Sequence, residues 1–438
     1  MTYQAPPGTY DLLPERAQVF NSIRQSAFEL FGRYGYLPIE TPVFEQLDVF
    51  VRGIGDATDV IGKEMYLVLS QHALAKLAQG GKAPEVSSIL ALRPEQTAGV
   101  ARAVVQHQLA SPGGAPVKLV YAGPMFRHEH PQKGRYREFR QIGVECLGAA
   151  EPSADAEVII MLMRFFAELG IPRDRMRLLL NSMGDDSCRP AYRQQIQDYI
   201  LAHAGDLCAE CVRRADSNPL RAFDCKNPGC QTIMADAPLI ADVLCDECRT
   251  HYDAVRAYLD AADIDYEEAP RLVRGLDYYT RTVFEVQVTE GLGAQNAIGG
   301  GGRYDRLIED FGGKPTPGLG FAVGFERIWL VLESLEALKS ANFELGAPRV
   351  FLATVENAAR PLAFELARQL RDAGISAELD HQARSLKSQF KLADRLKAAF
   401  VAILGPDELA DGKLTLRDMA TREESLLALT DIVERLRA

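Results

Sequence analysis

The sequence predicts an α+β protein whose larger part, residues 1–335, contains an antiparallel sheet, and whose smaller C-terminal part is an α/β domain. In the larger part, helices do not regularly separate the candidate strands, as they would in a doubly wound parallel fold. These strands are predicted at residues 118–122, 141–147, 282–288 and 319–323. Near the C-terminus, by contrast, strand and helix patterns alternate. The 438 residues suffice for two or three domains.

The first elements of the larger part are a helix and an extended segment. Apolar residues at helical spacing predict a helix over residues 18–34, and Gly35 is a natural stop just past its end. The next segment, YLPIETPVF at 36–44, is extended, and its prolines confine it to a sheet edge or boundary. A second helix is predicted over residues 153–169, with Ser153 as its N-cap.

Residues from about 185 to about 270 differ from the rest of the larger part. Helical segments predominate there, and we interpret them as an insertion domain. This stretch contains cysteines in closely spaced pairs, Cys208, Cys211, Cys225, Cys230, Cys245 and Cys248.

The C-terminal part is predicted to be a separate domain. A helix is expected at about 325–339, a linker at 340–348, and the domain itself at 349–438. Its predicted strands are 349–353, 376–379 and 400–404, and its predicted helices are 360–373 and one beginning at Ser385. This alternation indicates a parallel α/β arrangement.

The composition is that of a globular protein outside the membrane. Apolar residues make up 47% of the chain and charged residues 25%. The longest dense apolar run, residues 158–163, is too short to span a bilayer. The first residues, MTYQAPPGTYD, lack the basic and apolar regions of a secretory signal. We therefore expect a cytoplasmic protein.

The charge distribution restricts the kind of nucleic-acid partner. A net charge of -11 argues against a general nucleic-acid coat protein, although a local basic surface could still contact RNA. Lys387, Lys391 and Arg395 recur every four residues and would share one face of the helix that begins at Ser385. Spacing alone favours an ordinary solvated face, and RNA contact is the alternative.

Two arginine-bearing stretches indicate a site for a polyanionic small molecule. In GPMFRHEHPQKGRYREFRQIGVECLG, residues 123–148, a polar loop lies between two strand-like segments. Its arginines are Arg127, Arg135, Arg137 and Arg140. In LVRGLDYYTRTVFE, residues 272–285, Arg274 lies near Tyr278 and Tyr279 at the start of a strand. The planar guanidinium group suits phosphate and carboxylate ligands.

These stretches resemble the histidyl-tRNA synthetase family of class II aminoacyl-tRNA synthetases. Residues 123–148 resemble class II motif 2, 318–328 (GLGFAVGFERI) resembles motif 3, and 272–285 resembles a signature of the histidyl family. Further similar stretches are PGTYDLLP at 7–14, LRPEQT at 92–97, GGGGRYD at 299–305 and RSLKSQFKLAD at 384–394. The resemblance implies an antiparallel catalytic sheet, a homodimer with motif 1 at its interface, and a C-terminal anticodon-binding domain.

The resemblance also implies a reaction and its partners. L-Histidine and ATP would give histidyl-adenylate, with Mg²⁺ bridging phosphate oxygens, and the histidyl group would pass to the 3′ end of tRNA(His). The implied catalytic residues are Arg127 and Arg274. The implied histidine-binding residues are Glu95, Thr97, Arg127, Gln141, Glu145, Arg274, Tyr278 and Tyr279. ATP binding is implied for Arg127, Arg135 and Arg327, and tRNA binding for Gln132, Lys387, Lys391 and Arg395.

Two residues depart from the family pattern. Gln96 stands where the family usually has glycine, and His130 replaces a common arginine in the motif 2 loop. The resemblance also leaves one alternative function, a non-catalytic, histidine-binding regulatory subunit of ATP phosphoribosyltransferase. Arg274 within its full signature and the anticodon-like C-terminal part both argue against that alternative.

Glycines and cysteines raise two further questions. Gly299–Gly302 lack the Lys-Ser/Thr of a phosphate-binding P-loop, so we expect these glycines, with Gly318, Gly320 and Gly324, to let a ligand approach a strand backbone closely. His128-Glu129-His130 does not match the zinc-protease spacing. The six paired cysteines could hold structural zinc, with Cys146 and Cys188 apart from them, but buried thiols are the preferred interpretation.

Overall fold

The computed structural model describes residues 3–55, 58–80, 88–111, 113–293, 296–340 and 347–437. The chain divides into two compact units, Met1–Phe343 and Glu344–Ala438. Most of the predicted linker, 340–348, lies outside the described residues. Among the described helices, none combines the length and the apolar character that crossing a membrane requires.

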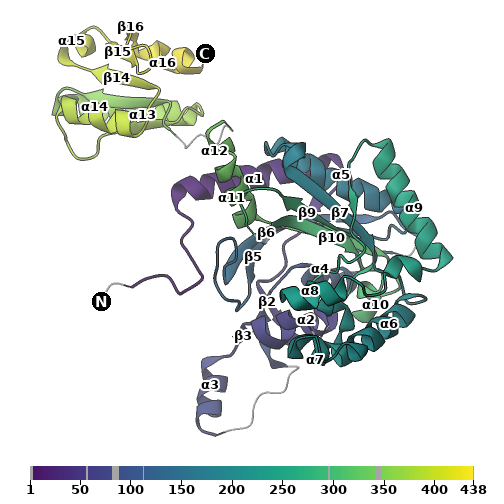
Figure 1. Ribbon diagram of the computed structural model, residues 1–438. Helices are drawn as coiled ribbons and strands as arrows, with labels where there is room; N and C mark the ends of the chain where they lie inside the picture. The colour runs from purple at the N-terminus through teal and green to yellow at the C-terminus, as the bar shows by residue number, and fades with distance from the viewer. Residues whose placement is uncertain are drawn as a thin grey trace. The chain divides into compact units, whose positions relative to one another are not determined.

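An eight-stranded sheet forms the centre of the larger unit (Figure 1). Its order is β1 (Leu37–Pro38), β5 (Val117–Phe126), β6 (Glu138–Leu147), β11 (Gly318–Gly324), β10 (Ala297–Arg303), β9 (Thr280–Val288), β7 (Met176–Ser182) and β8 (Glu267–Glu268). Adjacent strands from β5 to β7 pair antiparallel, and only the edge strands β1 and β8 pair parallel with their neighbours. The predicted antiparallel sheet is therefore confirmed.

The predicted strands differ from the observed ones in length and number. β5 was expected to end at residue 122, but it continues through Gly123 and Pro124, where Pro124 lies opposite Arg140 of β6. β7 was not predicted, because its short apolar run MRLLLNS has no periodicity that separates a buried strand from a helix segment.

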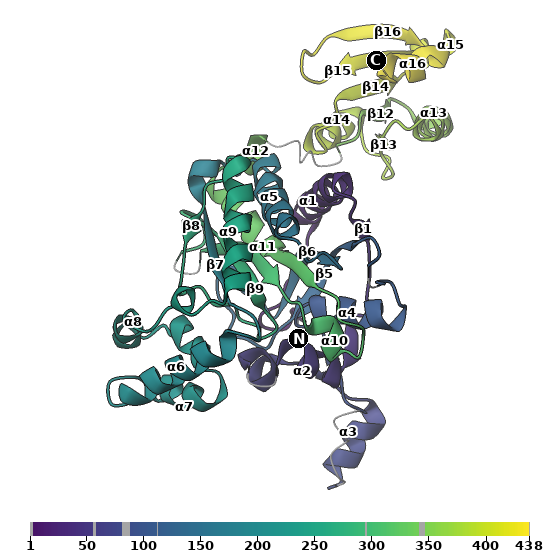
Figure 2. The same cartoon turned by 90° about the vertical axis from the view of Figure 1, so that its right-hand side faces the viewer.

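Four helices cover one face of the sheet (Figures 1 and 2). They are α1 (Pro14–Arg33), α5 (Pro152–Glu168), α9 (Asp246–Ala261) and α11 (Phe325–Ser334). Phe31 of α1 packs edge-on against Phe321 of β11, with ring centroids 5.6 Å apart. Ser153 is not the N-cap of α5: Glu151 holds that position, and Pro152, whose fixed φ suits a first turn, begins the helix.

A buried ion pair ties the sheet to this helical layer. Arg303 of β10 donates hydrogen bonds to both carboxylate oxygens of Asp155 of α5, and each side chain is 1% exposed. His251 of α9 lies 3.4 Å from the same carboxylate. Burial alone would raise the pKa of Asp155, but the Arg303 charge, the hydrogen bonds from Arg303 and the adjacent His251 together outweigh burial and hold that pKa at about 2. The carboxylate is therefore ionised at neutral pH.

The insertion contributes a second core. Its helices α6 (Arg189–Ala202), α7 (Ala209–Ser217) and α8 (Pro228–Met234) gather around buried cysteines and aliphatic residues. Figure 2 shows them at the end of the sheet away from α1. The last helix, α9, returns to the main core, where Val255 and Leu259 are buried with the residues of α5.

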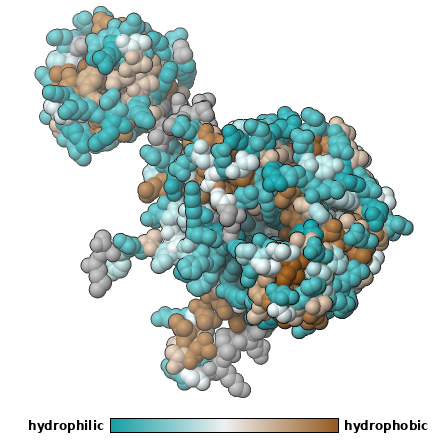
Figure 3. Space-filling model, in the orientation of Figure 1, coloured by the Kyte–Doolittle hydropathy of each residue, from teal (hydrophilic) through white to brown (hydrophobic). Residues whose placement is uncertain are grey.

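A small three-stranded sheet borders the other side of the larger unit. It contains β2 (Phe44–Gln46), β4 (Leu90–Leu92) and β3 (Leu67–Val68), and it precedes α4 (Thr97–Gln106). The segment predicted as extended, 36–44, contributes the edge strand β1 and the first residue of β2. Leu67, Leu69 and Leu74 are exposed around β3 and α3 (Gln71–Ala78), and the same region is apolar in Figure 3.

The smaller unit has a five-stranded mixed sheet. Its order is β13 (Ala377–Leu379), β12 (Val350–Thr354), β14 (Phe400–Leu404), β15 (Lys413–Asp418) and β16 (Glu424–Ala428). β13, β12 and β14 are parallel, as predicted, and α13 (Arg360–Asp372) and α14 (Leu386–Arg395) connect them. The sequence analysis did not predict β15 and β16, which add an antiparallel hairpin with Arg422 at φ 64° in its turn.

The buried ion pair gives a stability prediction. Asp155→Ala leaves the Arg303 charge buried without its main partner, so we expect the free energy of unfolding to fall by about 3–5 kcal/mol. Glu168→Ala is the matched control, because Glu168 lies on the same helix and pairs with Arg33 at an exposed site. Chemical denaturation of both variants measures the difference. Equal, small losses would contradict the structural role assigned to the buried pair.

Candidate active site

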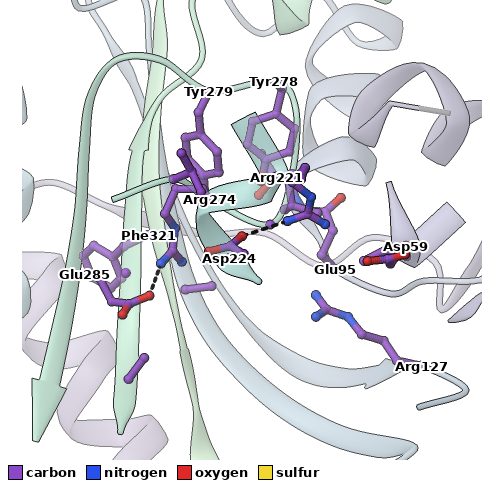
Figure 4. Close-up of a pocket in the computed structure, with 18 of the residues that line it drawn as sticks. Asp59, Glu95, Arg127, Arg221, Asp224, Arg274, Tyr278, Tyr279, Glu285 and Phe321 are labelled. Carbon is purple, nitrogen blue, oxygen red and sulfur yellow. Dashed lines mark hydrogen bonds and ion pairs between the residues drawn. The ribbon is translucent and has the colours of Figure 1, made fainter. Parts of the chain in front are cut away.

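A cavity of about 750 Å³ opens on the face of the sheet opposite the four helices. Its walls come from β5, β6, β9, β10 and β11, from the start of α4, and from the insertion. Ten of the lining side chains are labelled in Figure 4. The cavity brings together the site residues that the sequence predicts, which are Glu95, Thr97, Arg127, Arg135, Gln141, Glu145, Arg274, Tyr278, Tyr279 and Arg327.

A buried carboxylate, that of Glu145, lies at the floor of the cavity. Glu145 belongs to β6 and is 1% exposed. Thr97 donates a hydroxyl hydrogen bond to its Oε1 at 2.7 Å and Tyr121 donates another at 3.2 Å, while Tyr304 donates to Oε2. Burial raises the pKa of Glu145 to about 8, although the hydrogen bonds from Tyr304 and Thr97 act to lower it.

The carboxyl group of Glu145 can form at least one more hydrogen bond. A carboxylate can accept about four hydrogen bonds, and the hydroxyls of Thr97, Tyr121 and Tyr304 supply three. One acceptor position therefore remains for a donor inside the cavity. With a pKa near 8, the group can also hold a proton at neutral pH and donate it to an acceptor on a ligand.

Three glycines of β10 and β11 leave space for side chains of the site to pack directly against the strand backbone. A Cβ on Gly320 would lie 2.3 Å from Glu145 Oε2, and a Cβ on Gly300 would lie 3.1 Å from the guanidinium carbon of Arg274. At Gly302 it would lie 2.9 Å from the ring of Tyr279. The expected close approach therefore exists, but at these positions the side chains of the protein, rather than a ligand, occupy the space.

Glu95 has a local structural task as well as a place in the cavity. Its two oxygens accept hydrogen bonds from the N–H groups of Thr97 at 2.7 Å and Ala98 at 2.9 Å, which begin α4. This contact compensates the unpaired amides of the helix terminus. Gln141 differs, because its buried Oε1 has no hydrogen-bond partner within the described part of the chain. That oxygen is available to a donor such as an ammonium group.

Gln96, the departure from the family pattern, is itself buried at 2% exposure. Its φ of −113° and ψ of −17° lie in the helical region, so this position does not need a glycine conformation. Its side-chain oxygen also has no partner among the described residues.

Six arginines line the cavity, and four of them, Arg127, Arg135, Arg274 and Arg327, were predicted from the sequence. Arg127 donates from Nε to the carbonyl of Pro94 at 3.0 Å, and Arg274 donates to the carboxylate of Glu285 at 2.6 Å (Figure 4). Arg135 pairs with Glu129 at 3.0 Å, and Arg327 donates to the carbonyl of Ala297. Burial, followed by the neighbouring charge of Arg135, lowers the pKa of Arg327. Where these four arginines meet, the carboxylates in the wall are those of Glu129 and Glu326, so positive charge exceeds negative charge in this part and favours an anionic ligand.

Two other arginines of the 123–148 stretch stabilise the surrounding structure instead. Arg140 packs over the ring of Tyr10 at 5.6 Å, and its backbone N–H bonds the carboxylate of Glu326 at 3.0 Å. The backbone N–H of Arg137 donates a hydrogen bond to the carbonyl of Gly8 at 2.7 Å and so holds the N-terminal segment against this loop. Neither side chain lines the cavity.

The aromatic wall consists of two adjacent tyrosines and a third beyond them. The rings of Tyr278 and Tyr279 have centroids 4.6 Å apart, and Tyr278 meets Tyr304 edge-on at 5.5 Å. Burial raises the pKa of Tyr278 and of Tyr279, so both phenols stay neutral. They can therefore act as hydrogen-bond donors as well as packing surfaces.

The insertion supplies cavity residues that the sequence did not predict. Arg214 pairs with Asp59 at 3.0 Å, and Arg221 pairs with Asp224 at 3.3 Å. Arg214, Arg221, Asp224 and Lys226 belong to the insertion and line the cavity, and Asp59 lines it from outside the insertion. No sequence signal identified them, because only tertiary packing brings the insertion over the sheet.

The residues predicted to contact tRNA lie outside the cavity. Gln132 is exposed in the loop after β5, where its backbone exchanges hydrogen bonds with Arg135. His130 is exposed in the same loop. In the smaller unit, Lys387, Lys391 and Arg395 are exposed on α14, whereas its apolar face packs against β12 and Gln389 bonds the backbone of Thr354.

The fold and the cavity together define a class II aminoacyl-tRNA synthetase. A family model described as histidyl-tRNA synthetase matches residues 84–328, and one described as an anticodon binding domain matches residues 349–438. A relative named histidine–tRNA ligase from Anaeromyxobacter sp. (strain K) is 44% identical over 429 residues, 98% of each chain. Another of that name, from Pelotomaculum thermopropionicum, is 44% identical over 435 residues, 99% of this chain and 97% of its own.

Solved structures agree. The apo histidyl-tRNA synthetase of S. aureus matches with a TM-score of 0.80 and 33% identity, covering 100% of both chains. An ATP phosphoribosyltransferase regulatory subunit/histidyl-tRNA synthetase from Bacillus halodurans matches with a TM-score of 0.60 and 21% identity, covering 92% of this chain and 99% of its own. The second match shows a shared fold only. The chain belongs to the histidyl-tRNA synthetase family.

The raised pKa of Glu145 gives a pH-dependence prediction. The folded protein retains this proton up to about pH 8, whereas the unfolded chain releases it near pH 4.5, so stability falls as pH rises through that window. Glu145→Gln removes the titration. Between about pH 4.5 and pH 8, the free energy of unfolding of Glu145→Gln should therefore increase relative to that of the wild type. The expected increase is up to about 1.4 kcal/mol for each pH unit.

Unfolding of the ligand-free proteins at pH 5.5, 7.0 and 8.5 measures this shift. Glu29→Gln, at an exposed position on α1, controls for the loss of a charge in general. Parallel stability curves for Glu145→Gln and wild type would show that Glu145 does not titrate in this range.

Proposed function

We propose that the chain activates L-histidine with ATP to form histidyl-adenylate and transfers the histidyl group to the 3′ end of tRNA(His). The observation that carries the proposal is one cavity whose wall contains both the buried carboxyl group of Glu145 and the four predicted arginines, Arg127, Arg135, Arg274 and Arg327. Such a cavity has one part suited to a ring with N–H groups and another suited to phosphates. Membership in the histidyl-tRNA synthetase family supports the same function.

In this proposal Glu145 and Tyr279 hold the imidazole ring, with Tyr278 beside them. Glu145 has one acceptor position left after its three hydroxyl donors, and it can meet a ring nitrogen in either protonation state. A site that must pair a buried polar group rejects analogues without the matching group, by roughly 10⁴-fold or more. Phenylalanine and leucine would leave the carboxyl group buried and underbonded.

The α-amino group of histidine is assigned to Gln141, Glu95 and Thr97. The unpaired Oε1 of Gln141 accepts one ammonium hydrogen, and the carboxylate of Glu95 retains acceptor capacity beyond its two bonds to α4. These three side chains recognise the ammonium group, which all amino acids share. The choice of histidine over other amino acids therefore depends on Glu145.

Activation brings two anions together, and the arginines make that approach favourable. A carboxylate oxygen of histidine attacks the α-phosphorus of ATP in line, and pyrophosphate leaves. Arg127 and Arg274 are proposed to stabilise the α-phosphate from two sides, because fixed donors stabilise charge that develops in the transition state. Arg135 and Arg327 are proposed to hold the outer phosphates.

The acidic side chains of the cavity fit a magnesium ion bound together with phosphates. Glu129 and Glu285 present hard oxygen ligands beside Arg135 and Arg274, and Mg²⁺ usually takes one or two carboxylates plus phosphate oxygens. When bound, the ion neutralises phosphate charge. The arginines and these two carboxylates orient the nucleotide within the cavity.

Transfer to tRNA needs a base for the ribose hydroxyl. We infer that the phosphate of the adenylate accepts this proton, since no side chain of the chain is assigned as the base.

Gln132 and His130 are proposed to meet the acceptor end of the tRNA, and the basic face of α14 is proposed to contact the anticodon region. A homodimer is proposed from the class II architecture.

Histidine-dependent exchange of pyrophosphate into ATP tests the proposed function and separates it from the regulatory alternative. We expect exchange with histidine and none above background with glutamine or phenylalanine. Formation of histidyl-tRNA by the same preparation then tests the second step. A protein that binds histidine but shows no exchange would be a sensor rather than a ligase.

Arg274→Ala should reduce histidine-dependent exchange by about 10²–10³-fold or more, the range observed when one preorganised electrostatic group is removed. Arg271→Ala is the matched control, because Arg271 is exposed in the same segment and does not line the cavity. Exchange kinetics at saturating histidine and ATP measure the effect. Near wild-type exchange in a folded Arg274→Ala protein would refute the assigned role.

Removal of residues 344–438 should largely preserve exchange and reduce charging by roughly 10²-fold or more, because a second binding contact with tRNA is lost. The matched variant keeps this unit and replaces Lys387, Lys391 and Arg395 with alanine. It should weaken tRNA binding and flatten its salt dependence, since fewer counterions are released. Full charging by the truncated protein would contradict RNA binding by this unit.

A further inference from the structure

Seven of the eight cysteines fall into two compact groups within the insertion. The first group consists of Cys208, Cys211, Cys225 and Cys230, and the second of Asp185, Cys188, Cys245 and Cys248. In each group, the potential ligand atoms all lie within 4.8 Å of one another. The structure corrects the sequence analysis in two ways: Cys188 is not set apart, and Cys245 and Cys248 do not join the other four paired cysteines.

The geometry of the first group matches tetrahedral zinc. Four thiolate sulfurs bound at about 2.3 Å around one ion lie about 3.8 Å from one another. Cys208 and Cys225 have sulfurs 3.8 Å apart. A disulfide would need about 2.05 Å, and all eight cysteines are free thiols. The Cys208 amide also donates to the sulfur of Cys230 at 3.2 Å, a contact that stabilises a thiolate ligand.

The second group repeats this local design. Cys208 and Cys245 each hold the N-cap position of a helix, and Cys211 and Cys248 follow in the first turn. Repetition of one helix-opening Cys-x-x-Cys unit, each paired with two ligands from elsewhere, is hard to explain as incidental burial.

Asp185 completes the second group. Its Oδ1 lies 3.7 Å from the sulfur of Cys188 and 3.8 Å from that of Cys245, while its Oδ2 accepts from Arg281 at 3.2 Å. A ligand carboxylate oriented by a second partner is typical of metal centres. Gly184 provides the space, because a Cβ there would lie 2.6 Å from the sulfur of Cys188. Its φ of 64° is also one that glycine adopts readily.

We propose that the insertion holds two structural zinc ions, one bound by four cysteines and one by three cysteines and Asp185. Thiolate-rich tetrahedral sites select zinc over magnesium or calcium. A closed shell of four protein ligands leaves no open position, so these ions stabilise structure and do not take part in the reaction.

The two sites hold the insertion in relation to the active-site cavity. Cys225 lies between Asp224 and Lys226, which line the cavity, so the first ion fixes this wall. The second ion joins the segment after β7 to the start of α9, which closes the insertion at its base. Asp185 also contacts Arg281 at the start of β9, just after the paired tyrosines.

Metal analysis of the full-length protein, purified without chelators or a metal-affinity tag, tests the proposal independently of any synthetase activity. We expect two zinc ions per chain. Cys230→Ser and Cys188→Ser should each retain one, and Cys146→Ser, a buried cysteine of β6 outside both groups, should retain two. Less than about 0.2 zinc per chain, or iron or copper in its place, would overturn the proposal. Loss of zinc only in Cys230→Ser would overturn the second site.

X-ray absorption at the zinc edge of the wild-type protein covers the case in which a variant fails to fold. Seven sulfurs and one oxygen shared by two ions predict an average of about 3.5 sulfur neighbours at about 2.3 Å. Coordination dominated by nitrogen and oxygen would contradict both sites.

Chelation should lower the thermal midpoint of the larger unit, and zinc, but not magnesium, should restore it. An unchanged midpoint after complete zinc removal would contradict the structural role.

Discussion

The larger unit is organised around one buried carboxyl group, that of Glu145. Its hydrogen-bond donors come from the start of α4, from β5 and from the segment after β10, so three separate parts of the chain converge on it. Glycine at position 320 leaves the space that this carboxyl group occupies. An unpaired group so deeply buried would be costly, which makes the three hydroxyls and one further ligand donor a requirement of the site.

A second requirement is the separation of charges within one cavity. The arginines are held by local acceptors: Arg274 by Glu285, Arg135 by Glu129, and Arg127 by the carbonyl of Pro94. These contacts fix the guanidinium groups before any ligand arrives, so little reorganisation is needed when phosphates enter. Glu145 lies at the floor of the same cavity, where the hydroxyls rather than the arginines surround it.

Local sequence patterns were sufficient to predict the antiparallel sheet and several of the helices, and the residues that the family resemblance assigned to histidine and ATP line one cavity. They failed where distant segments meet. Ser153 was a plausible cap until Pro152 proved to start α5, and the β15–β16 hairpin had no recognised turn signal. The pairing of Asp185 and Cys188 with Cys245 and Cys248 depends on the insertion closing on itself, as does the position of Arg221 and Asp224 over the sheet.

The central claim is that the Glu145 carboxyl group recognises the imidazole ring. A crystal structure of the protein with bound L-histidine tests it most directly. We expect a ring nitrogen within about 3.2 Å of a Glu145 carboxylate oxygen, with the α-amino group near the Gln141 side-chain oxygen. A ring bound elsewhere in the cavity, with Glu145 contacting only Thr97, Tyr121 and Tyr304, would contradict the account.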